Sequence, residues 1–246
     1  MSLPVHLVPS LDGASVGSVV RVDGDEAHHA VAVRRMRVGE ALLLTDGRGA
    51  LAGGAVEATG KLTLDVRLTS YGVVAEPAPS VTVVQALAKG DRGERAVEVL
   101  TEIGAARIVP WAAARSVAVW KGDRTAKSLA RWRATAREAA KQSRRAWHPE
   151  VAEPASTGDV LEIVAAADLA VILHEEATGS LASLAVPEAG EVLLVVGPEG
   201  GLTDDEVTAF VAAGAHAVRL GTEVLRTSTA GVAATAAILA RTPRWS

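Results

Sequence analysis

The stretch VLLVVGPEGGLTDDE, residues 192–206, decides the fold class of this chain. Its five leading apolar residues, 192–196, predict a buried strand. A glycine turn follows this strand, and an acidic helical pattern follows the turn. A strand, a glycine turn and a helix in succession are typical of an open α/β sheet. Such sheets bind ligands beyond the carboxyl ends of their strands, so we expect a ligand at this turn.

The turn itself has the features of a binding loop. Gly197, Gly200 and Gly201 permit a positive φ and a close approach of the backbone to a ligand. Thr203 predicts a helix N-cap, and Glu206, three residues on, completes a capping box. The glycine spacing matches neither nucleotide-binding fingerprint, and the acidic helix start repels anions. We therefore expect a neutral or cationic ligand, with plain strand-to-helix punctuation as the alternative.

A second stretch, LGTEVLRTSTA at 220–230, favours the binding interpretation. Residues 217–220 predict another short strand, which leads into a polar loop rich in hydroxyl groups. Residues 230–239 then predict an alanine-rich helix. Two strands thus deliver loops to the same edge of the sheet.

Together, GPEGGLT (197–203) and LGTEVLRTSTA (220–230) resemble the C-terminal signature of the RsmE-type methyltransferases of the SPOUT superfamily. Further matching segments follow the family's order and extend the resemblance over nearly the whole chain: AKGDR at 88–92, TEIG at 101–104, Arg115-Ser116, and EAAKQS at 138–143. The resemblance implies methylation of N3 of a uridine in small-subunit (16S) ribosomal RNA, with S-adenosylmethionine as the methyl donor.

The predicted elements fall into two groups separated by a linker at 71–80, of which residues 76–80 are proline-rich. Before it, short strands are expected at 5–8, 18–22, 41–45, 50–57 and 62–68, with one helix at about 25–35. After it, strands at 81–87, 107–111, 169–173, 192–196 and 217–220 alternate with helices at 91–105, 121–145, 204–213 and 230–239. The first pattern predicts a small barrel or sandwich, and the second a mostly parallel α/β sheet. Residues 149–188 give little beyond one strand.

The resemblance adds detail to this division. It implies a PUA-like β-barrel RNA-binding domain at residues 1–72 and a SPOUT methyltransferase domain at 73–246. In the family the second domain is tied in a C-terminal trefoil knot, an exception to the rule that chains are unknotted. The family also forms homodimers in which the cofactor site is completed near the partner subunit. Knot and homodimer are thus expectations from resemblance alone.

Composition excludes several classes of function. The 246 residues include no cysteine, which rules out disulfides and thiolate chemistry. Residues 1–10 lack a basic leader, and no run approaches the roughly 18 apolar residues that span a bilayer. The default expectation is therefore a cytoplasmic protein without a membrane partner. The adjacent His28 and His29 point in different directions on a helix, so we expect no metal site.

The overall net charge of −4 hides a basic segment. Residues 121–145 contain nine basic and two acidic side chains, a local balance of +7, so the remaining chain carries −11. Projected as a helix, this segment places its apolar residues on one arc, namely Leu129, Trp132, Ala136, Ala139 and Ala140. The opposite basic face is predicted to bind RNA phosphates, and a merely solvated face is the alternative.

The candidate site residues follow from these stretches and the resemblance. Arg226 is the catalytic candidate, to orient the uridine or stabilise its anion, and a structural ion pair is its alternative role. Glu199 either meets the charge of the cofactor sulfonium or caps the loop. The remaining cofactor candidates enclose an apolar cleft: Leu173, His174, Gly197, Gly200, Gly201, Leu220, Gly221 and Leu225. The RNA candidates are basic: Arg34, Arg35, Arg115, Arg137, Arg144 and Arg145.

Four positions depart from the family pattern. Ser228 stands where the family usually has glutamate, Arg144 where it has glycine, Val99 where it has lysine, and Trp147 near an expected arginine. The general base is therefore open, and Trp147 is either a base-stacking residue or part of the core. Rival functions are a non-catalytic RNA-binding protein, a SPOUT methyltransferase of another RNA, and, least favoured, a nucleotide-phosphate enzyme.

Overall fold

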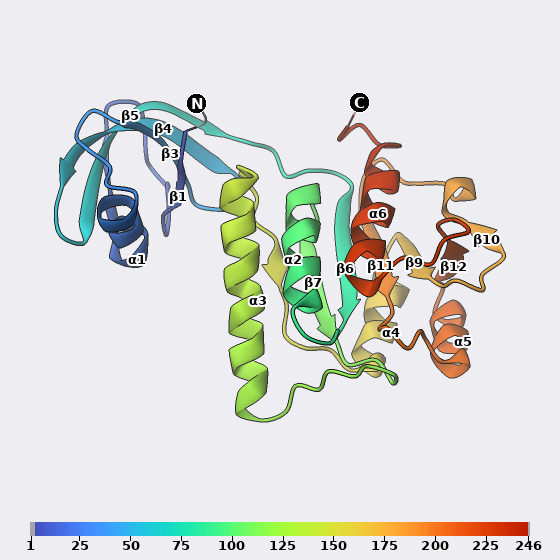
Figure 1. Cartoon of the computed structure of the whole chain (residues 1–246). Helices are drawn as coiled ribbons and strands as arrows, with labels where there is room; N and C mark the ends of the chain where they lie inside the picture. Colours follow the sequence, from blue (N-terminus) through green and yellow to red (C-terminus); the bar gives the residue numbers. More distant parts are fainter. Residues whose placement is uncertain (1–2, 246) are drawn as a thin grey trace. The chain divides into compact units, whose positions relative to one another are not determined.

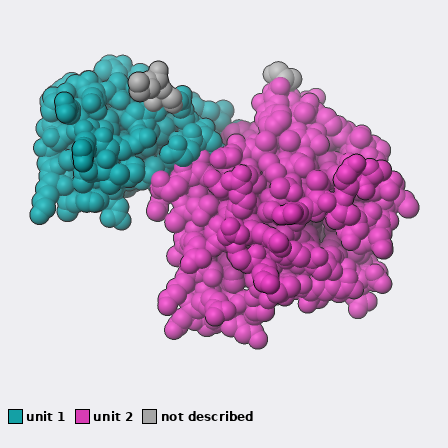
Figure 2. Space-filling model, in the orientation of Figure 1, with its two compact units in different colours: residues 1–76, 141–148 teal, residues 77–140, 149–246 magenta. Residues whose placement is uncertain are grey.

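The computed structural model describes residues 3–245 of the chain. These residues form two compact units (Figure 2). The first consists of the chain up to Glu76 together with Lys141–His148, and the second of Pro77–Ala140 and the chain from Pro149 onward. The segment Lys141–His148 thus belongs to the first unit, although the residues on either side of it belong to the second.

The first unit is built on a five-stranded sheet in the order β1-β3-β4-β5-β2. Its strands are β1 (Val5–Leu7), β2 (Val19–Asp23), β3 (Ala41–Thr45), β4 (Ala50–Thr59) and β5 (Thr63–Val73). The pairs are antiparallel except for β1 with β3. The register between β4 and β5 shifts at Gly53/Gly54 and Val56/Ala58, and such bulges bend strands and increase their twist. Alternate side chains such as Leu42, Leu44 and Leu64 fill the core.

The helix expected at 25–35 is present in a modified form. Residues Gly24–His28 form α1, and His29–Val33 continue it as one π-helical stretch, η1. Ala27 and Ala30 are fully buried, so the small side chains let this segment lie against the sheet. The segment is followed by Arg35, which has a φ of 57°.

Trp147 belongs to the packing of the first unit. Its indole nitrogen donates to the carbonyl oxygen of Val74 at 2.9 Å. A Cβ added at Gly49, where φ is 104°, would lie 2.8 Å from the indole ring. The ring therefore packs directly on a glycine that no side chain could replace without movement. Trp147 is half-buried, so it packs within the first unit without belonging to its buried core.

The second unit is a seven-stranded parallel sheet in the order β10-β12-β9-β11-β6-β7-β8 (Figure 1). Its strands are β6 (Ser80–Ala86), β7 (Arg107–Trp111), β8 (Glu150–Val151), β9 (Leu169–Leu173), β10 (Gly179–Ser180), β11 (Glu191–Val196) and β12 (His216–Arg219). All neighbouring pairs run parallel. The α/β class and the parallel sheet predicted from the sequence are confirmed.

Helices cover both faces of this sheet. On one face lie α2 (Arg92–Ile103), α3 (Asp123–Gln142) and α6 (Thr227–Leu239), and on the other α4 (Thr157–Ala166) and α5 (Asp204–Ala212). A short 3-10 turn, η2 (Leu181–Ser183), joins the first face. The central strand β11 sends Val192, Leu194 and Val196 to one core and Leu193 and Val195 to the other. An unbroken apolar run therefore marks a strand covered on both sides.

The predicted elements are present, but β5 is longer than expected, and α4, η2 and the short strands β8 and β10 had not been predicted. Residues 71–73 continue β5 instead of beginning a linker, because β4 is long enough to pair with them. Helix α4 was missed, although Ser156 and Asp159 form a capping box at its start. The apolar residues of α4 do not form a clear stripe at helical spacing, so the helical pattern in the sequence is weak.

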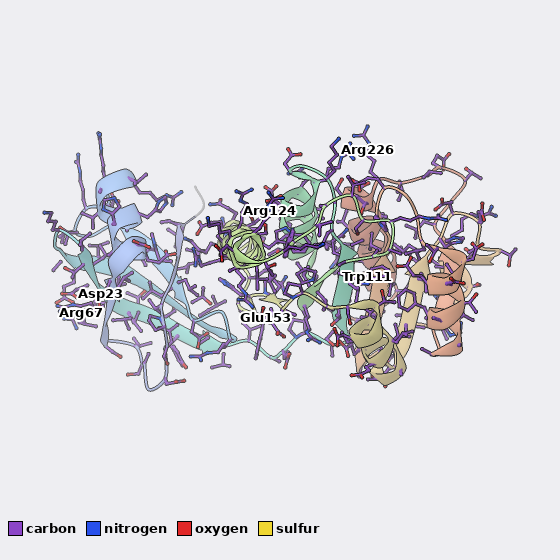
Figure 3. All side chains as sticks on the ribbon, turned by 90° about the horizontal axis from the view of Figure 1, so that it is seen from below. Asp23, Arg67, Trp111, Arg124, Glu153 and Arg226 are labelled. Atoms are coloured by element: carbon purple, nitrogen blue, oxygen red, sulfur yellow. The ribbon has the colours of Figure 1, made fainter. Side chains whose placement is uncertain are left out.

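The basic helix α3 packs as expected. Its five predicted apolar residues are all buried. The Trp132 and Trp120 rings pack edge to face, with their centroids 5.1 Å apart. Part of the opposite face forms ion pairs, with Arg131 on Glu94 and Arg133 on Glu153. Arg124 and Lys127, nearer the start of the helix, are exposed. The first of these is labelled in Figure 3. Within residues 3–245, no helix combines the length and apolar character needed to cross a bilayer.

A buried charged cluster holds the first unit together. Lys141 donates from Nζ to Oε1 of Glu26 at 2.8 Å, and Nδ1 of His6 lies 3.4 Å from the other carboxylate oxygen. The His6 and Lys141 side chains are 1% and 7% exposed. Burial alone would raise the pKa of Glu26, but the contacts with His6 and Lys141 outweigh it and lower this pKa to about 2.

We predict that Glu26→Gln destabilises the chain at neutral pH and much less in acid. A carboxyl whose folded pKa is depressed stabilises the fold above its ordinary pKa of 4.5, and this contribution disappears as the pH falls toward 2. At pH 7 the loss should be about 2–3 kcal/mol. Urea titrations followed by circular dichroism at pH 7 and pH 3 measure it.

The control is Glu57→Gln, which breaks the half-exposed pair of Glu57 with Arg67 in the same unit. It should cost less than about 1 kcal/mol at either pH. Equal losses for Glu26→Gln at both pH values would contradict the assigned role of the ionised carboxylate.

Candidate active site

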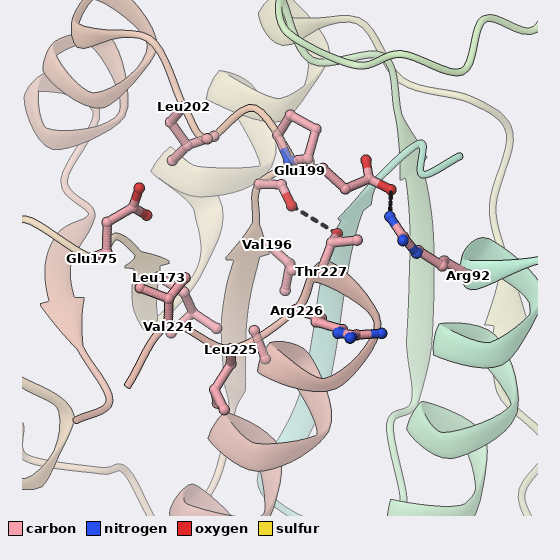
Figure 4. Close-up of a pocket in the computed structure, with 14 residues that line it drawn as sticks. Arg92, Leu173, Glu175, Val196, Glu199, Leu202, Val224, Leu225, Arg226 and Thr227 are labelled. Carbon is pink, nitrogen blue, oxygen red and sulfur yellow. Dashed lines mark hydrogen bonds and ion pairs between the residues drawn. The ribbon is translucent and has the colours of Figure 1, made fainter. Parts of the chain in front are cut away.

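A pocket of about 360 Å³ lies at the carboxyl ends of β9 and β11, beside the start of α6 (Figure 4). Its wall combines apolar side chains with glycines and a few charged groups: Leu173, Val196, Gly197, Pro198, Glu199, Gly201, Leu202, Val224, Leu225, Arg226, Thr227, Ala230, Arg92 and Glu175. Neighbouring parallel strands end at this edge, which is where open α/β sheets bind ligands. The pocket is within the size range of small-molecule and cofactor sites.

A second hollow of about 130 Å³ adjoins the first and shares part of its wall, including Leu173, Glu175 and Leu225. It adds the backbone and side chains that follow β9 and β12, among them His174, Leu220 and Gly221. Every predicted cofactor residue except Gly200 lines one of the two hollows. The structure therefore brings together residues from loops more than 40 positions apart in the sequence.

Gly200 faces the outer side of the loop. A Cβ added there would lie 3.1 Å from Cβ of Arg115, and Gly200 lines neither hollow. Gly201 does line the pocket, and its φ of 70° is in the left-handed region that favours glycine. The two adjacent glycines thus serve different needs: Gly200 allows close packing against Arg115, and Gly201 allows the turn.

A buried hydrogen-bond network ties the two key loops together. The Thr227 hydroxyl donates to the carbonyl oxygen of Gly197 at 2.8 Å. Gln85, at the end of β6 and 1% exposed, donates from Nε2 to the same hydroxyl at 3.1 Å and to the Thr227 carbonyl at 3.3 Å. The glycine turn, the start of α6 and strand β6 are therefore linked through one threonine.

The predicted capping box of α5 is confirmed. Thr203 accepts from the Glu206 amide through its hydroxyl, and Glu206 accepts the Thr203 amide at 2.9 Å. The other carboxylate oxygen of Glu206 accepts the amide of Ala114 at 2.8 Å. The first turn of α5 is thus capped by its own side chains and is also hydrogen-bonded to the loop that follows β7.

Glu199 forms an ion pair at the pocket wall. Its Oε1 accepts the amide of Lys89 at 3.0 Å and an Nη1 hydrogen of Arg92 at 2.9 Å. Burial would raise the pKa of Glu199, but backbone hydrogen bonds and Arg92 lower it below its ordinary value. Glu199 is therefore ionised at neutral pH and is held to the segment that begins α2. Of its two expected roles, the structure supports that of anchoring the loop.

Arg226 occupies the N-cap position of α6, with extended backbone angles. Its guanidinium lines the pocket and is exposed, on the same side as Arg92 (Figure 4). Figure 3 shows the side chain projecting away from the ribbon. Within residues 3–245, no ion pair or hydrogen bond holds this guanidinium, so the alternative of a structural ion pair has no partner there. The cation is free to meet a substrate.

Ser228, where the resemblance implies a glutamate, is 9% exposed and lines neither hollow. The carboxylates of the main pocket are instead Glu175 and Glu199. Among residues 3–245, no group of three or more His, Cys, Asp or Glu side chains is close enough to hold a metal ion.

The predicted RNA residues lie in different settings. Arg34 and Arg35 are exposed in the first unit, after η1. Arg137 is exposed on α3, with Nε 3.6 Å from Glu138. Arg144 has a φ of 55°, a backbone conformation that favours the glycine implied by the resemblance, and Arg145 is half-buried. Arg115 donates to two carbonyl oxygens of the glycine loop.

Sequence reasoning missed several residues that line the pocket or, like Gln85, support its wall. Arg92 and Thr227 lie within stretches that carried the resemblance, and Glu175 follows the predicted His174, so adjacency was the available signal. Leu202 follows the glycine turn directly. Gln85 gave no local signal, because a glutamine at the end of a predicted strand is usually solvated.

Comparison with known proteins agrees with this geometry. A family described as "RNA methyltransferase domain" matches residues 75–239, and one described as "RNA methyltransferase PUA domain" matches residues 22–69. These matches and the site at the strand ends define a two-part RNA methyltransferase.

Curated proteins similar in sequence to this chain identify the family within the RNA methyltransferases. "Ribosomal RNA small subunit methyltransferase E" of Mycobacterium bovis is 50% identical over 233 residues, which cover 93% of this chain and 89% of the relative. The protein of the same name from Bacillus subtilis is 31% identical, with 88% of each chain covered. The chain belongs to the ribosomal RNA small subunit methyltransferase E family.

Solved structures of methyltransferases have the same fold as this chain. A crystal structure of the Neisseria gonorrhoeae member, bound to S-adenosyl methionine, superposes with a TM-score of 0.86 at 28% identity and 98% coverage of both chains. A putative methyltransferase from Legionella pneumophila, in complex with the same cofactor, gives a TM-score of 0.89 at 27% identity, with 98% of this chain and 99% of that chain covered.

We predict that Thr227→Val weakens the binding of S-adenosylmethionine about tenfold, because the Gly197 carbonyl and the Gln85 amide lose their shared partner. Isothermal titration calorimetry measures the affinity. The matched control is Thr235→Val, which removes a buried hydroxyl bonded to Gly231 further along α6. An equal effect of both substitutions would assign the loss to general destabilisation of the helix.

Proposed function

We propose that this chain transfers a methyl group from S-adenosylmethionine to N3 of a uridine in 16S ribosomal RNA. The observation that carries the proposal is a pocket at the strand ends whose wall combines apolar side chains and glycines with Arg226, a cation that has no partner among residues 3–245. The names of the relatives and the cofactor bound by the Neisseria gonorrhoeae member support the reaction class.

The residues present suit this cofactor. Leu173, Val196, Leu202 and Leu225 offer an apolar surface for an adenine ring, and Gly201 leaves the backbone open to close approach. When bound, S-adenosylmethionine supplies an electrophilic methyl group on a sulfonium. Glu175, exposed at the wall, adds negative charge that complements a cation.

The chemistry at the uridine assigns a role to Arg226. The N3 hydrogen is a weak acid between two carbonyl groups, and its loss spreads negative charge onto O2 and O4. A guanidinium held beside the base can orient these oxygens and stabilise that charge as it develops. Glu199 is engaged by Arg92 and the Lys89 amide, so we assign it to shaping the site and not to proton removal.

Several further proposals rest on the resemblance. Residues 1–72 act as an RNA-binding domain, with Arg34 and Arg35 among its contacts, and residues 73–246 carry out methyl transfer. The C-terminal segment forms the trefoil knot, in keeping with α6, which packs back across β6 and β11 after the more peripheral β12. The functional form is a homodimer that acts on the small subunit in the cytoplasm, where ribosomes assemble.

We predict that Arg226→Gln lowers kcat about 100-fold while leaving cofactor affinity near that of the unaltered chain, because the charge acts mainly on the developing anion. Transfer of a labelled methyl group to small subunits lacking this modification measures kcat, and mass spectrometry of the nucleosides identifies N3-methyluridine. Labelled RNA with the methyl group elsewhere would contradict the assigned atom.

The control for this substitution is Arg95→Gln. Arg95 is paired with Glu98 on α2 and does not line the pocket, so its loss removes one positive charge without touching the site. It should leave kcat unchanged. A similar decline in both variants would mean that net charge, and not the position of Arg226, governs the rate.

We also predict a pH–rate profile that rises in proportion to hydroxide concentration through neutral and mildly alkaline pH. The pKa of Glu199 lies below its ordinary value, so this carboxylate is already ionised at neutral pH and adds no further rise. The rise then reports loss of the N3 proton beside Arg226. Single-turnover rates measure it, and a flat profile would instead indicate a carboxylate base in the pocket.

A further inference from the structure

Arg115 lies in the loop that follows β7, and its side chain is turned toward the glycine loop. Its Nη1 donates to the carbonyl oxygen of Gly200 at 3.2 Å and to that of Leu202 at 3.1 Å. Because one guanidinium nitrogen binds two carbonyls on either side of Gly201, it bridges the turn. Both Arg115 and Arg34 are exposed, but Arg34 makes no such contact with a loop carbonyl among residues 3–245.

A second contact fixes the same loop at its backbone. The amide of Ala114, the residue before Arg115, donates to Oε1 of Glu206 at 2.8 Å. Glu206 is 5% exposed, and its other oxygen completes the capping box with Thr203. The loop after β7 is thus attached to both ends of residues 200–206, by the side chain at one end and the backbone at the other.

The packing at Gly200 shows how closely the two loops meet. A Cβ at this position would lie 3.1 Å from Cβ of Arg115 and 3.4 Å from its carbonyl oxygen. Contacts this short are tighter than ordinary packing, so a side chain at 200 would press on Arg115. Gly200 does not line the pocket. The lack of a side chain at this position instead allows Arg115 to pack against the loop.

The Arg115 bridge affects the pocket because the residues that it holds also form part of the pocket wall. Gly201 and Leu202 both line the pocket, and Leu202 is 4% exposed. With the carbonyls of Gly200 and Leu202 held on the outer side, Gly201 is kept at its φ of 70° and Leu202 in the wall. Loss of the bridge frees the turn to adopt other conformations, and cofactor binding then has to restore it.

We propose that Arg115 is a positioning residue that preorganises the cofactor loop through Gly201 and Leu202, in place of the RNA contact expected from the sequence. The role rests on the proposed function, because it takes S-adenosylmethionine as the ligand of the pocket. It predicts that Arg115 controls cofactor affinity in the absence of RNA.

The test compares Arg115→Ala, Arg115→Lys and Arg34→Ala in the full chain. Calorimetry with S-adenosylmethionine alone gives cofactor affinity, and fluorescence anisotropy with a 16S RNA fragment gives RNA affinity. Arg115→Ala should weaken cofactor binding at least tenfold, as expected for a lost charged hydrogen-bond donor, and leave RNA affinity within about twofold. Arg34→Ala should do the reverse. Arg115→Lys should recover part of the loss, because an ammonium can still donate to one carbonyl.

Two further readouts separate positioning from a loss of fold. Hydrogen exchange of residues 197–203 in the cofactor-free chain should accelerate in Arg115→Ala, while exchange in β6 and β11 stays unchanged. At saturating cofactor, kcat should approach that of the unaltered chain. If Arg115→Ala does not fold, Gly200→Ala provides the second variant: it presses on Arg115 from the loop side and should likewise weaken cofactor binding.

Unchanged cofactor affinity in Arg115→Ala, together with weaker RNA binding, would overturn the positioning role and restore the RNA contact. Unchanged affinity in a folded Gly200→Ala variant would also count against it. An unaltered chain that binds no S-adenosylmethionine would overturn the proposed function and this role with it. Normal binding by the unaltered chain combined with normal binding by Arg115→Ala would overturn the positioning role alone.

Discussion

The site depends first on the hydroxyl of Thr227, which donates to the Gly197 carbonyl and accepts from the Gln85 amide. These three residues come from parts of the sequence separated by 30 and 142 positions. Inside the protein, where water does not compete, an unmade hydrogen bond at any of these groups is costly. The network therefore favours one arrangement of strand β6, the glycine turn and the start of α6, and the pocket lies beside that arrangement.

Around this network, the glycine turn is braced from outside. Arg115 binds the carbonyls of Gly200 and Leu202, and Glu199 is drawn to Arg92. Charged side chains that the sequence offers as candidates for RNA or cofactor are in part used to hold backbone in place. Within the described part of the chain, residues 3–245, the Arg226 guanidinium at the pocket wall has no ion-pair or hydrogen-bond partner. A braced loop beside this guanidinium suits electrostatic catalysis, because preorganised donors need not reorganise during the reaction.

Much of the fold was predictable, since it follows from local patterns. The apolar run at 192–196 marks a strand buried on both faces, and Thr203 with Glu206 marks the start of α5. The apolar arc of the basic helix gave its buried face correctly. Helix α4 was missed because its ten residues show little amphipathic contrast, although the capping residues Ser156 and Asp159 were a usable signal. Residues 71–73 were misplaced because strand length depends on the partner strand.

The sequence by itself determined the α/β class, the cluster of loops at one sheet edge, and the family, because periodicity, glycine turns and motif order are written along the chain. Tertiary structure alone decided that Gly200 faces Arg115, that Arg115 binds the loop, and that Gln85 takes part in the site. The reason is physical: the direction of a side chain and the partner of a buried polar group are set by contacts between segments distant in sequence, which no local pattern encodes.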